Sequence, residues 1–240
     1  MASSPFTPAP RRGGQPPRLL RPGLWAFPPN GATHGGQAWL LETTAGDLLI
    51  DAPPDTEACA AFLATRASRG PGWLVLLGRD GHGPGRWPWQ RLGWPVLAQE
   101  QEAYLLPGVE RLLTFGEDHA IAVGLHLYWT PGPSPGAAVL HARGGVAGAT
   151  TDILFCGRLL VPVGSGQLEA VPSPRTFHWP RLRRSVAALP SRLPPGSPTW
   201  LASGASAGAT GGNGLVENGA RWLGELAAAC QAQEGIGGRP

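Results

Sequence analysis

Polar residues that could do chemistry stand at the ends of short apolar runs. Asp51 ends the run Leu48-Leu49-Ile50, and the glycine-rich turn after residues 73–77 carries Asp80 and His82. Carboxylates and imidazoles can bind a metal ion or exchange a proton with a substrate. Asp51, Asp80 and His82 therefore form one candidate polar site. The alternative interpretation is that Asp80 and His82 hydrogen-bond within the turn and order it.

A second group of candidates is basic. Arg79 lies in the same turn, Arg158 follows an apolar run and a glycine, and Arg175 begins an aromatic-rich segment. Guanidinium groups bind carboxylate or phosphate through paired hydrogen bonds, so Arg79, Arg158 and Arg175 are candidates for an anion site. The alternative is that they pair with Asp51, Asp80 or backbone carbonyls and only fill space, because a buried arginine needs a partner.

Short strands between Gly and Pro turns are predicted to position these side chains. The predicted strands cover 19–27, 37–42, 47–51, 73–77, 95–98, 109–115, 121–130, 137–142, 153–156 and 199–202. Helices are predicted over 57–68, over 180–189 with Pro190 ending it, and over 215–230, and loops over 78–85 and 203–214. Strands in two groups with helices outside predict an α/β (α+β) fold of four layers: helix, sheet, sheet, helix.

The domain organisation follows from length and composition. A chain of 240 residues with 42% apolar content fits one domain with a substantial core. We expect a flexible Pro- and Arg-rich leader over residues 1–18, a single domain over 19–232 and a flexible tail over 233–240.

Composition argues against several classes of protein. All 19 basic residues are Arg, and they form no dense stripe with interleaved aromatics, so nucleic acid is an unlikely partner despite the net charge of +3. No apolar run has the length of a signal peptide or a membrane span, and the three cysteines are widely spaced. We therefore expect a cytoplasmic protein with free thiols and no membrane attachment.

The order of landmarks along the chain resembles the metallo-β-lactamase superfamily in its glyoxalase-II-like form. The matching pieces are Gly35 to Leu41, Leu49 to Pro53, Leu77 to Gly83, Thr130 to Gly136, Leu154 to Arg158 and Leu201 to Ala205. The resemblance implies a four-layer αββα metallo-β-lactamase-like sandwich. It also implies zinc or another transition metal, held at the sheet ends by His and Asp, that activates water for hydrolysis.

Most of the ligand positions that this resemblance implies hold other residue types here. They fall on Gly78, Asp80, His82, Gly83, Pro133, Arg158 and Ala205. Only Asp80 and His82 can donate to a metal, and the charge of Arg158 would repel one. We therefore predict no bound metal and no cofactor.

Three hypotheses about function follow. The first is a metallo-β-lactamase-fold protein with a decayed metal site, which is non-hydrolytic and binds an anionic small molecule. The second is a hydrolase of esterase or thioesterase type with a rebuilt or metal-independent site around Asp51, Asp80 and His82. The third is a structural interaction protein that presents the Arg- and Trp-rich residues 175–189 to an unidentified protein partner.

Overall fold

The computed structural model of the chain describes residues 10–82, 87–146, 149–164, 166–205 and 214–236. Its strands are β1 (Arg18–Arg21), β2 (Leu24–Ala26), β3 (Trp39–Thr43), β4 (Gly46–Ile50), β5 (Gly72–Leu76), β6 (Val96–Gln99), β7 (Leu112–Phe115), β8 (Asp118–Ala122), β9 (Leu125–Trp129), β10 (Ala138–Val146), β11 (Ala149–Phe155), β12 (Val161–Gly164), β13 (Gln167–Glu169), β14 (Trp200–Ala202) and β15 (Leu215–Glu217). Its helices are α1 (Glu57–Ala67), α2 (Arg79–His82), α3 (Trp87–Leu92), α4 (Trp179–Arg192) and α5 (Gly219–Ile236), with 3₁₀ turns η1 (Gly31–Thr33) and η2 (Glu100–Leu105).

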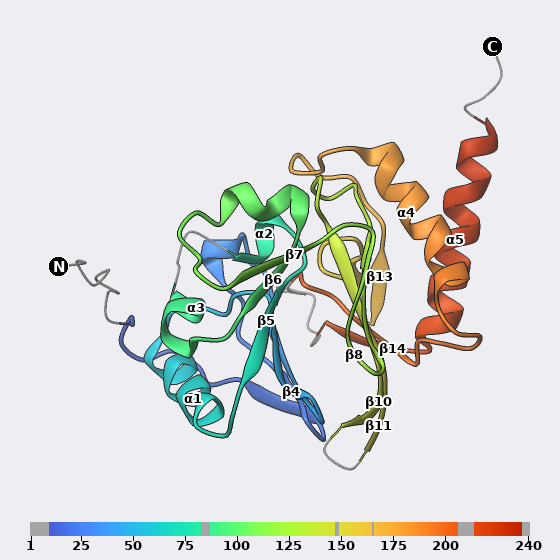
Figure 1. Cartoon of the computed structure of the whole chain (residues 1–240). Helices are drawn as coiled ribbons and strands as arrows, with labels where there is room; N and C mark the ends of the chain where they lie inside the picture. Colours follow the sequence, from blue (N-terminus) through green and yellow to red (C-terminus); the bar gives the residue numbers. More distant parts are fainter. Residues whose placement is uncertain (1–9, 83–86, 147–148, 165, 206–213, 237–240) are drawn as a thin grey trace.

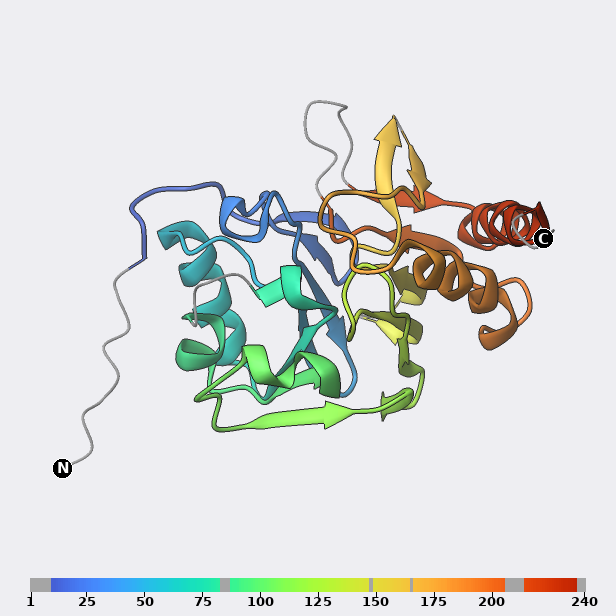
Figure 2. The ribbon, with the colours of Figure 1, turned by 90° about the horizontal axis from the view of Figure 1, so that it is seen from above.

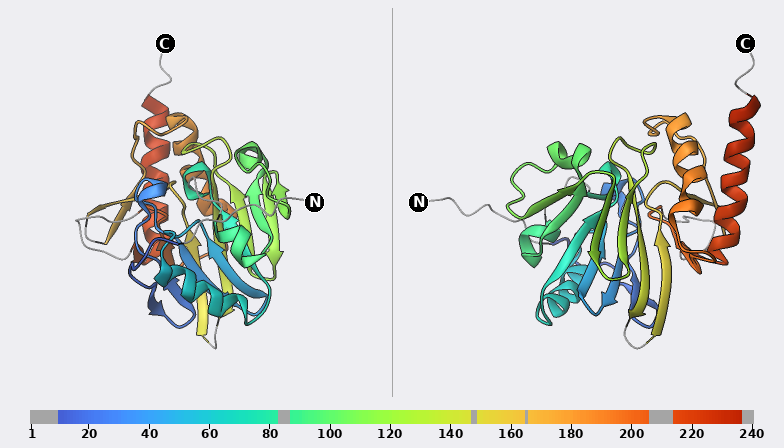
Figure 3. Two further views of the ribbon diagram at one scale, coloured as in Figure 1. Left: turned by 90° about the vertical axis from the view of Figure 1, so that its left-hand side faces the viewer. Right: turned by 45° about the vertical axis from the view of Figure 1, so that its right-hand side comes forward.

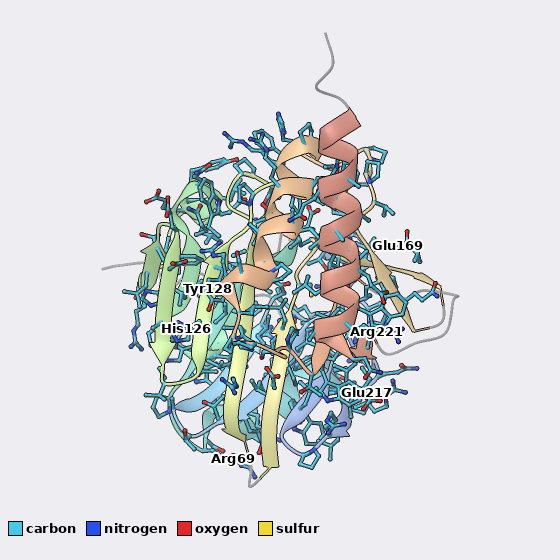
Figure 4. The ribbon with its side chains drawn as sticks, turned by 90° about the vertical axis from the view of Figure 1, so that its right-hand side faces the viewer. Arg69, His126, Tyr128, Glu169, Glu217 and Arg221 are labelled. Atoms are coloured by element: carbon cyan, nitrogen blue, oxygen red, sulfur yellow. The ribbon has the colours of Figure 1, made fainter. Side chains whose placement is uncertain are left out.

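Two mixed sheets pack face to face and carry helices on their outer faces (Figures 1 and 2). The first sheet has the order β1-β2-β3-β4-β5-β6-β7 and is parallel from β4 to β7. The second has the order β15-β14-β11-β10-β9-β8, with β11 and β14 parallel. Helices α1 and α3 pack on the first sheet, and α4 and α5 lie side by side on the second (Figures 3 and 4). This arrangement confirms the predicted four-layer fold.

Alternating side chains let each sheet bury both of its faces. In β4, Leu48 and Ile50 point into the core between the sheets, while Leu49 packs in the cluster beneath α1. In β11, Phe155 faces the core between the sheets, and Leu154 packs in the cluster formed with α4 and α5. Because side chains two apart share one face of a strand, an apolar residue at every position indicates burial on both faces.

The ends of the central strands bring the candidate residues to one edge of the sheets. Asp51 follows β4 and Gly78 follows β5, and these strands are parallel neighbours. Arg158 follows β11 and Ala205 follows β14, which are also parallel neighbours. An isolated bridge between Gly36 and Ala205 links the two sheets at this end. We call this end of the sheets the site edge.

Some predicted elements differ from the structure. The single strand predicted over 121–130 is part of a hairpin, β8 and β9, because Gly124 turns the chain with a φ of +77°. The strand predicted over 19–27 is likewise a pair, β1 and β2. The loop predicted over 78–85 begins with the short helix α2, and residues 83–86 lie outside the described part of the chain.

The two C-terminal helices also have different limits from those predicted. Pro190 lies inside α4 rather than ending it, since a proline in the last turn removes only one backbone hydrogen bond. Residues 215–217 form β15 instead of helix, and Asn218, with a φ of +60°, separates that strand from α5. Helix α5 then continues to Ile236, into the tail predicted over 233–240.

Part of the predicted leader packs against the domain. Arg11 N donates to Asp55 O, and Gly13 N donates to the carboxylate of Glu57 at the start of α1. Residues 1–9 lie outside the described part. None of the helices in the described ranges combines the length and the hydrophobicity that crossing a membrane requires.

Candidate functional site

A small pocket lies at the site edge, and we call it the edge pocket. Its lining includes Asp51, Gly78, Asp80, Pro133 and Arg158, so the fold gathers four of the predicted ligand positions and one further candidate. Its free volume is about 20 Å³, which is room for roughly one water molecule. The pocket therefore has space for a very small group only.

Asp51 is the buried carboxyl group of the edge pocket. It is 7% exposed, and its Oδ1 accepts a hydrogen bond from Leu77 N at 2.9 Å. Gly81 packs directly against it, because a Cβ at position 81 would lie 2.0 Å from Asp51 Oδ1. Burial raises the pKa of Asp51 to about 7, and the Leu77 amide and the charge of Arg158 offset only part of that effect. Asp51 is therefore partly protonated at neutral pH.

Arg158 reaches from the end of β11 to the loop between β2 and β3. Its Nη2 donates to the carbonyl oxygens of Thr33 at 2.6 Å and His34 at 3.2 Å. Its positive charge offsets part of the rise in the pKa of Asp51 and contributes to the lowered pKa of Asp80. Arg158 is therefore paired with backbone carbonyls, which is one of the alternatives drawn from the sequence.

Asp80, in α2, is paired with Arg175 from the segment between β13 and α4. Arg175 Nε donates to Asp80 Oδ2 at 3.2 Å, and Arg175 Nη2 contacts Oδ1. Burial alone would raise the pKa of Asp80, but the hydrogen bonds and charge of Arg175, helped by Arg158 and His34, hold it below its ordinary value. Asp80 is therefore ionised and has both oxygens engaged.

Three further predicted residues, His82, Ala205 and Arg175, are not among the described residues that line the edge pocket. His82 lines an adjoining groove together with Arg79 and Arg175, and Arg79 lines both the groove and the pocket. Ala205 is occupied by its bridge to the β2–β3 loop, and Gly83 lies outside the described residues. Of the three arginines predicted as one anion site, Arg158 therefore lines the edge pocket, Arg175 lines the groove, and Arg79 lines both.

Ser134 is a site residue that the sequence did not single out. It follows Pro133 in the loop before β10, it is 3% exposed, and its Oγ has no hydrogen-bond partner among the described residues. A Cβ at Gly78 would lie 3.1 Å from that oxygen. Its position beside Pro133 was the only signal that could have identified it.

A cluster of Ser, His and Asp lies on the outer face of the second sheet, away from the site edge. His141 Nε2 lies 2.8 Å from Asp152 Oδ1 and 3.1 Å from Ser197 Oγ, and Ser197 also contacts Asp152 directly. A catalytic triad places the serine and the carboxylate on different ring nitrogens. Because one nitrogen faces both partners, this cluster anchors the loop before β14 rather than activating a nucleophile.

Comparison with known proteins identifies the fold. No family model and no curated protein sequence matches the chain. Metallo-β-lactamase SMB-1 bound to 2-mercaptoethanesulfonate has a TM-score of 0.61 and 18% identity, covering 93% of this chain and 96% of that chain. A B3 metallo-β-lactamase with an active-site glutamic acid has a TM-score of 0.60 and 17% identity, covering 91% and 90%. The archaeal metallo-β-lactamase superfamily protein ST1585 from Sulfolobus tokodaii has a TM-score of 0.57 and 13% identity, covering 87% and 86%. The chain therefore has a metallo-β-lactamase-like fold.

The donor set at the site edge does not fit the zinc that this fold implies. Zinc sites in proteins use at least three His, Cys, Asp or Glu ligands. Across the described ranges, no three such side chains come together in a way that could hold a metal ion. Asp80 is already paired with Arg175, and Arg158 lines the same pocket. These residues support no metal-dependent step.

Proposed function

We propose that this chain is a non-hydrolytic protein of metallo-β-lactamase fold, with a decayed metal site, that binds an anionic small molecule. The observation that carries this proposal is the placement of Arg158. Its guanidinium lines the edge pocket and is tied to two backbone carbonyls, at the strand end where the resemblance implies a metal-binding Asp. A guanidinium about 4 Å from a divalent ion would oppose its binding by roughly 8 kcal/mol at an effective dielectric of about 20.

The charge balance of the site edge supports an anionic ligand. Arg79, Arg158 and Arg175 line the edge pocket or the adjoining groove. Asp80 supplies one full negative charge against them, while the raised pKa of Asp51, about 7, leaves that carboxyl only partly ionised at neutral pH. The net charge of these side chains is therefore positive, which favours an oxyanion over a cation or a neutral group.

A hydrolysis screen tests this proposal. The purified full chain is assayed against 4-nitrophenyl esters, acyl thioesters and β-lactams, with and without added zinc. We expect rates equal to those of the buffer in both conditions. A rate that appears with zinc and disappears with a chelator would overturn the proposal.

One observation favours a second candidate, a metal-independent hydrolase. A carboxyl group with a pKa of about 7, such as Asp51, is suited to accept a proton from water at neutral pH, and the unpartnered Ser134 hydroxyl lines the same pocket. The same screen separates the two candidates. A zinc-independent rate that Asp51→Asn abolishes, and that the matched surface change Glu225→Gln leaves intact, would establish the hydrolase.

A further inference from the structure

The groove beside the edge pocket is a better place for an anion than the edge pocket itself. We propose that this groove binds one oxyanion group, a phosphate or a carboxylate, carried on a small organic molecule. The inference rests on the proposed function and assigns it a location. We call this space the basic groove. Its lining includes Ala32, Arg79, Asp80, Leu105 and Arg175.

Size decides between the two spaces. The edge pocket leaves about 20 Å³, which is less than a phosphate or a carboxylate on a carbon chain needs. The basic groove encloses about 250 Å³, somewhat below the range of about 300–1,000 Å³ typical of sites for drug-sized ligands. A ligand with one anionic group and only a few further atoms fits this volume.

The arginines at the site edge differ in how their side chains are engaged. Arg158, in the edge pocket, donates to two carbonyls. Arg175 uses Nε and Nη2 on Asp80, but its side chain is 46% exposed. No hydrogen bond or ion pair joins the side chain of Arg79 to another residue in the described part of the chain. No described residue therefore competes for the guanidinium of Arg79, which makes Arg79 the first contact expected for an oxyanion in the groove.

Asp80 competes with the ligand for the guanidinium of Arg175. It contacts Arg175 from one side of the groove with both carboxylate oxygens, in an ion pair. An incoming oxyanion would share Arg175 with Asp80 or displace it. The apolar side chains of Ala32 and Leu105 line the same space and can contact the organic part of the ligand. Removing the charge of Asp80 should therefore strengthen binding.

Calorimetric titration of the full chain tests the assignment. The probes are inorganic phosphate, glycerol 3-phosphate and glycerate, with glycerol as the neutral control, at constant ionic strength. We expect one molecule of glycerol 3-phosphate or glycerate to bind per chain, more tightly than inorganic phosphate, and glycerol not to bind. The phosphate and carboxylate probes show which oxyanion is preferred.

Variants locate the site. Arg79→Gln should weaken binding by about tenfold or more, because a charge-assisted hydrogen-bonding group is lost. Asp80→Asn should strengthen it by about fivefold, because one negative charge leaves the groove wall. The matched control Arg221→Gln, on the outer helix α5 (Figure 4), should leave the affinity unchanged. A gain of affinity in Asp80→Asn cannot arise from partial unfolding.

Several results would overturn the assignment. Unchanged affinity in Arg79→Gln, or weaker binding in Asp80→Asn, would remove the basic groove as the site. Loss of binding in Arg158→Gln alone would place the anion in the edge pocket, and the proposed function would stand without the groove. Absence of binding by every probe at about 10 mM would also end the groove assignment. Zinc-dependent hydrolysis, in contrast, would overturn the proposed function whatever the titrations show.

Discussion

The substitution Asp51→Asn tests how the site edge treats its buried carboxyl group. Asn keeps the oxygen that accepts the Leu77 amide, and it tolerates the left-handed backbone of position 51, where φ is +59°. The change therefore removes a titratable group with little change in shape.

The size and sign of the effect follow from the pKa. Burial raises the pKa of Asp51 from its ordinary 3.8 to about 7. This rise corresponds to about 4 kcal/mol of difference in free energy between the protonated and ionised forms of the folded chain. Because the pKa of Asp51 is higher in the folded state than in the unfolded state, its protonation favours the folded state. This contribution to the free energy of unfolding is fully present below about pH 4 and is lost as the pH rises to about 7. The Asn variant has no such loss, so its free energy of unfolding should gain on the parent by about 4 kcal/mol across that window.

Urea denaturation of the two chains at several pH values between about 4 and 8 measures this gain, because effects of all other titrating groups cancel in the difference. The control Glu225→Gln, at an exposed site on α5, should show a nearly constant difference from the parent. A constant difference for Asp51→Asn as well would show that the carboxyl titrates near its ordinary pKa, and the account of a desolvated edge pocket would fail.

Two further substitutions test the packing that supports the site. Gly81→Ala should lower the free energy of unfolding by about 3 kcal/mol or more, because its Cβ would meet the Asp51 carboxylate. The control Gly224→Ala, in α5, has open space around its Cβ and should be neutral or stabilising. Equal effects of the two changes in urea denaturation would refute this. Arg66→Ala should cost about 1.5–3 kcal/mol, because Arg66 is 6% exposed and its charge-assisted hydrogen bond to the partly buried Glu42 is lost. The exposed neighbour change Arg69→Ala should cost less than about 1 kcal/mol in the same urea denaturation assay, and a cost for Arg66→Ala as small as that would contradict the reasoning.

The positions of the site residues along the fold were readable from the sequence. Asp51 and Gly78 follow apolar runs whose side chains are all buried except the partly buried Trp73, and that pattern predicts two central parallel strands that end at one edge. The strand that ends before Arg158 is readable for the same reason. Strand ends depend on local spacing, which a single sequence carries.

The partners of the site residues were not readable in the same way. Arg175 and Asp80 are 95 residues apart in the sequence, and Arg158 and Thr33 are 125 apart. No local pattern selects such pairs, so the sequence could offer only alternatives: an anion, a carboxylate or a backbone carbonyl. The separation of Arg175 from Arg158, with Arg79 lining both spaces, depends on how side chains fill the space at the sheet ends. Only the packed structure contains that information.

We propose that the site edge binds no metal ion. Equilibrium dialysis of the purified full chain against micromolar zinc, followed by elemental analysis, tests this claim. The arrangement of Arg158, Asp80 and Arg175 predicts fewer than about 0.1 zinc ions per chain, because fewer than three donors are present and two carboxyl groups face guanidinium charge. About one tightly bound zinc ion per chain would contradict the claim.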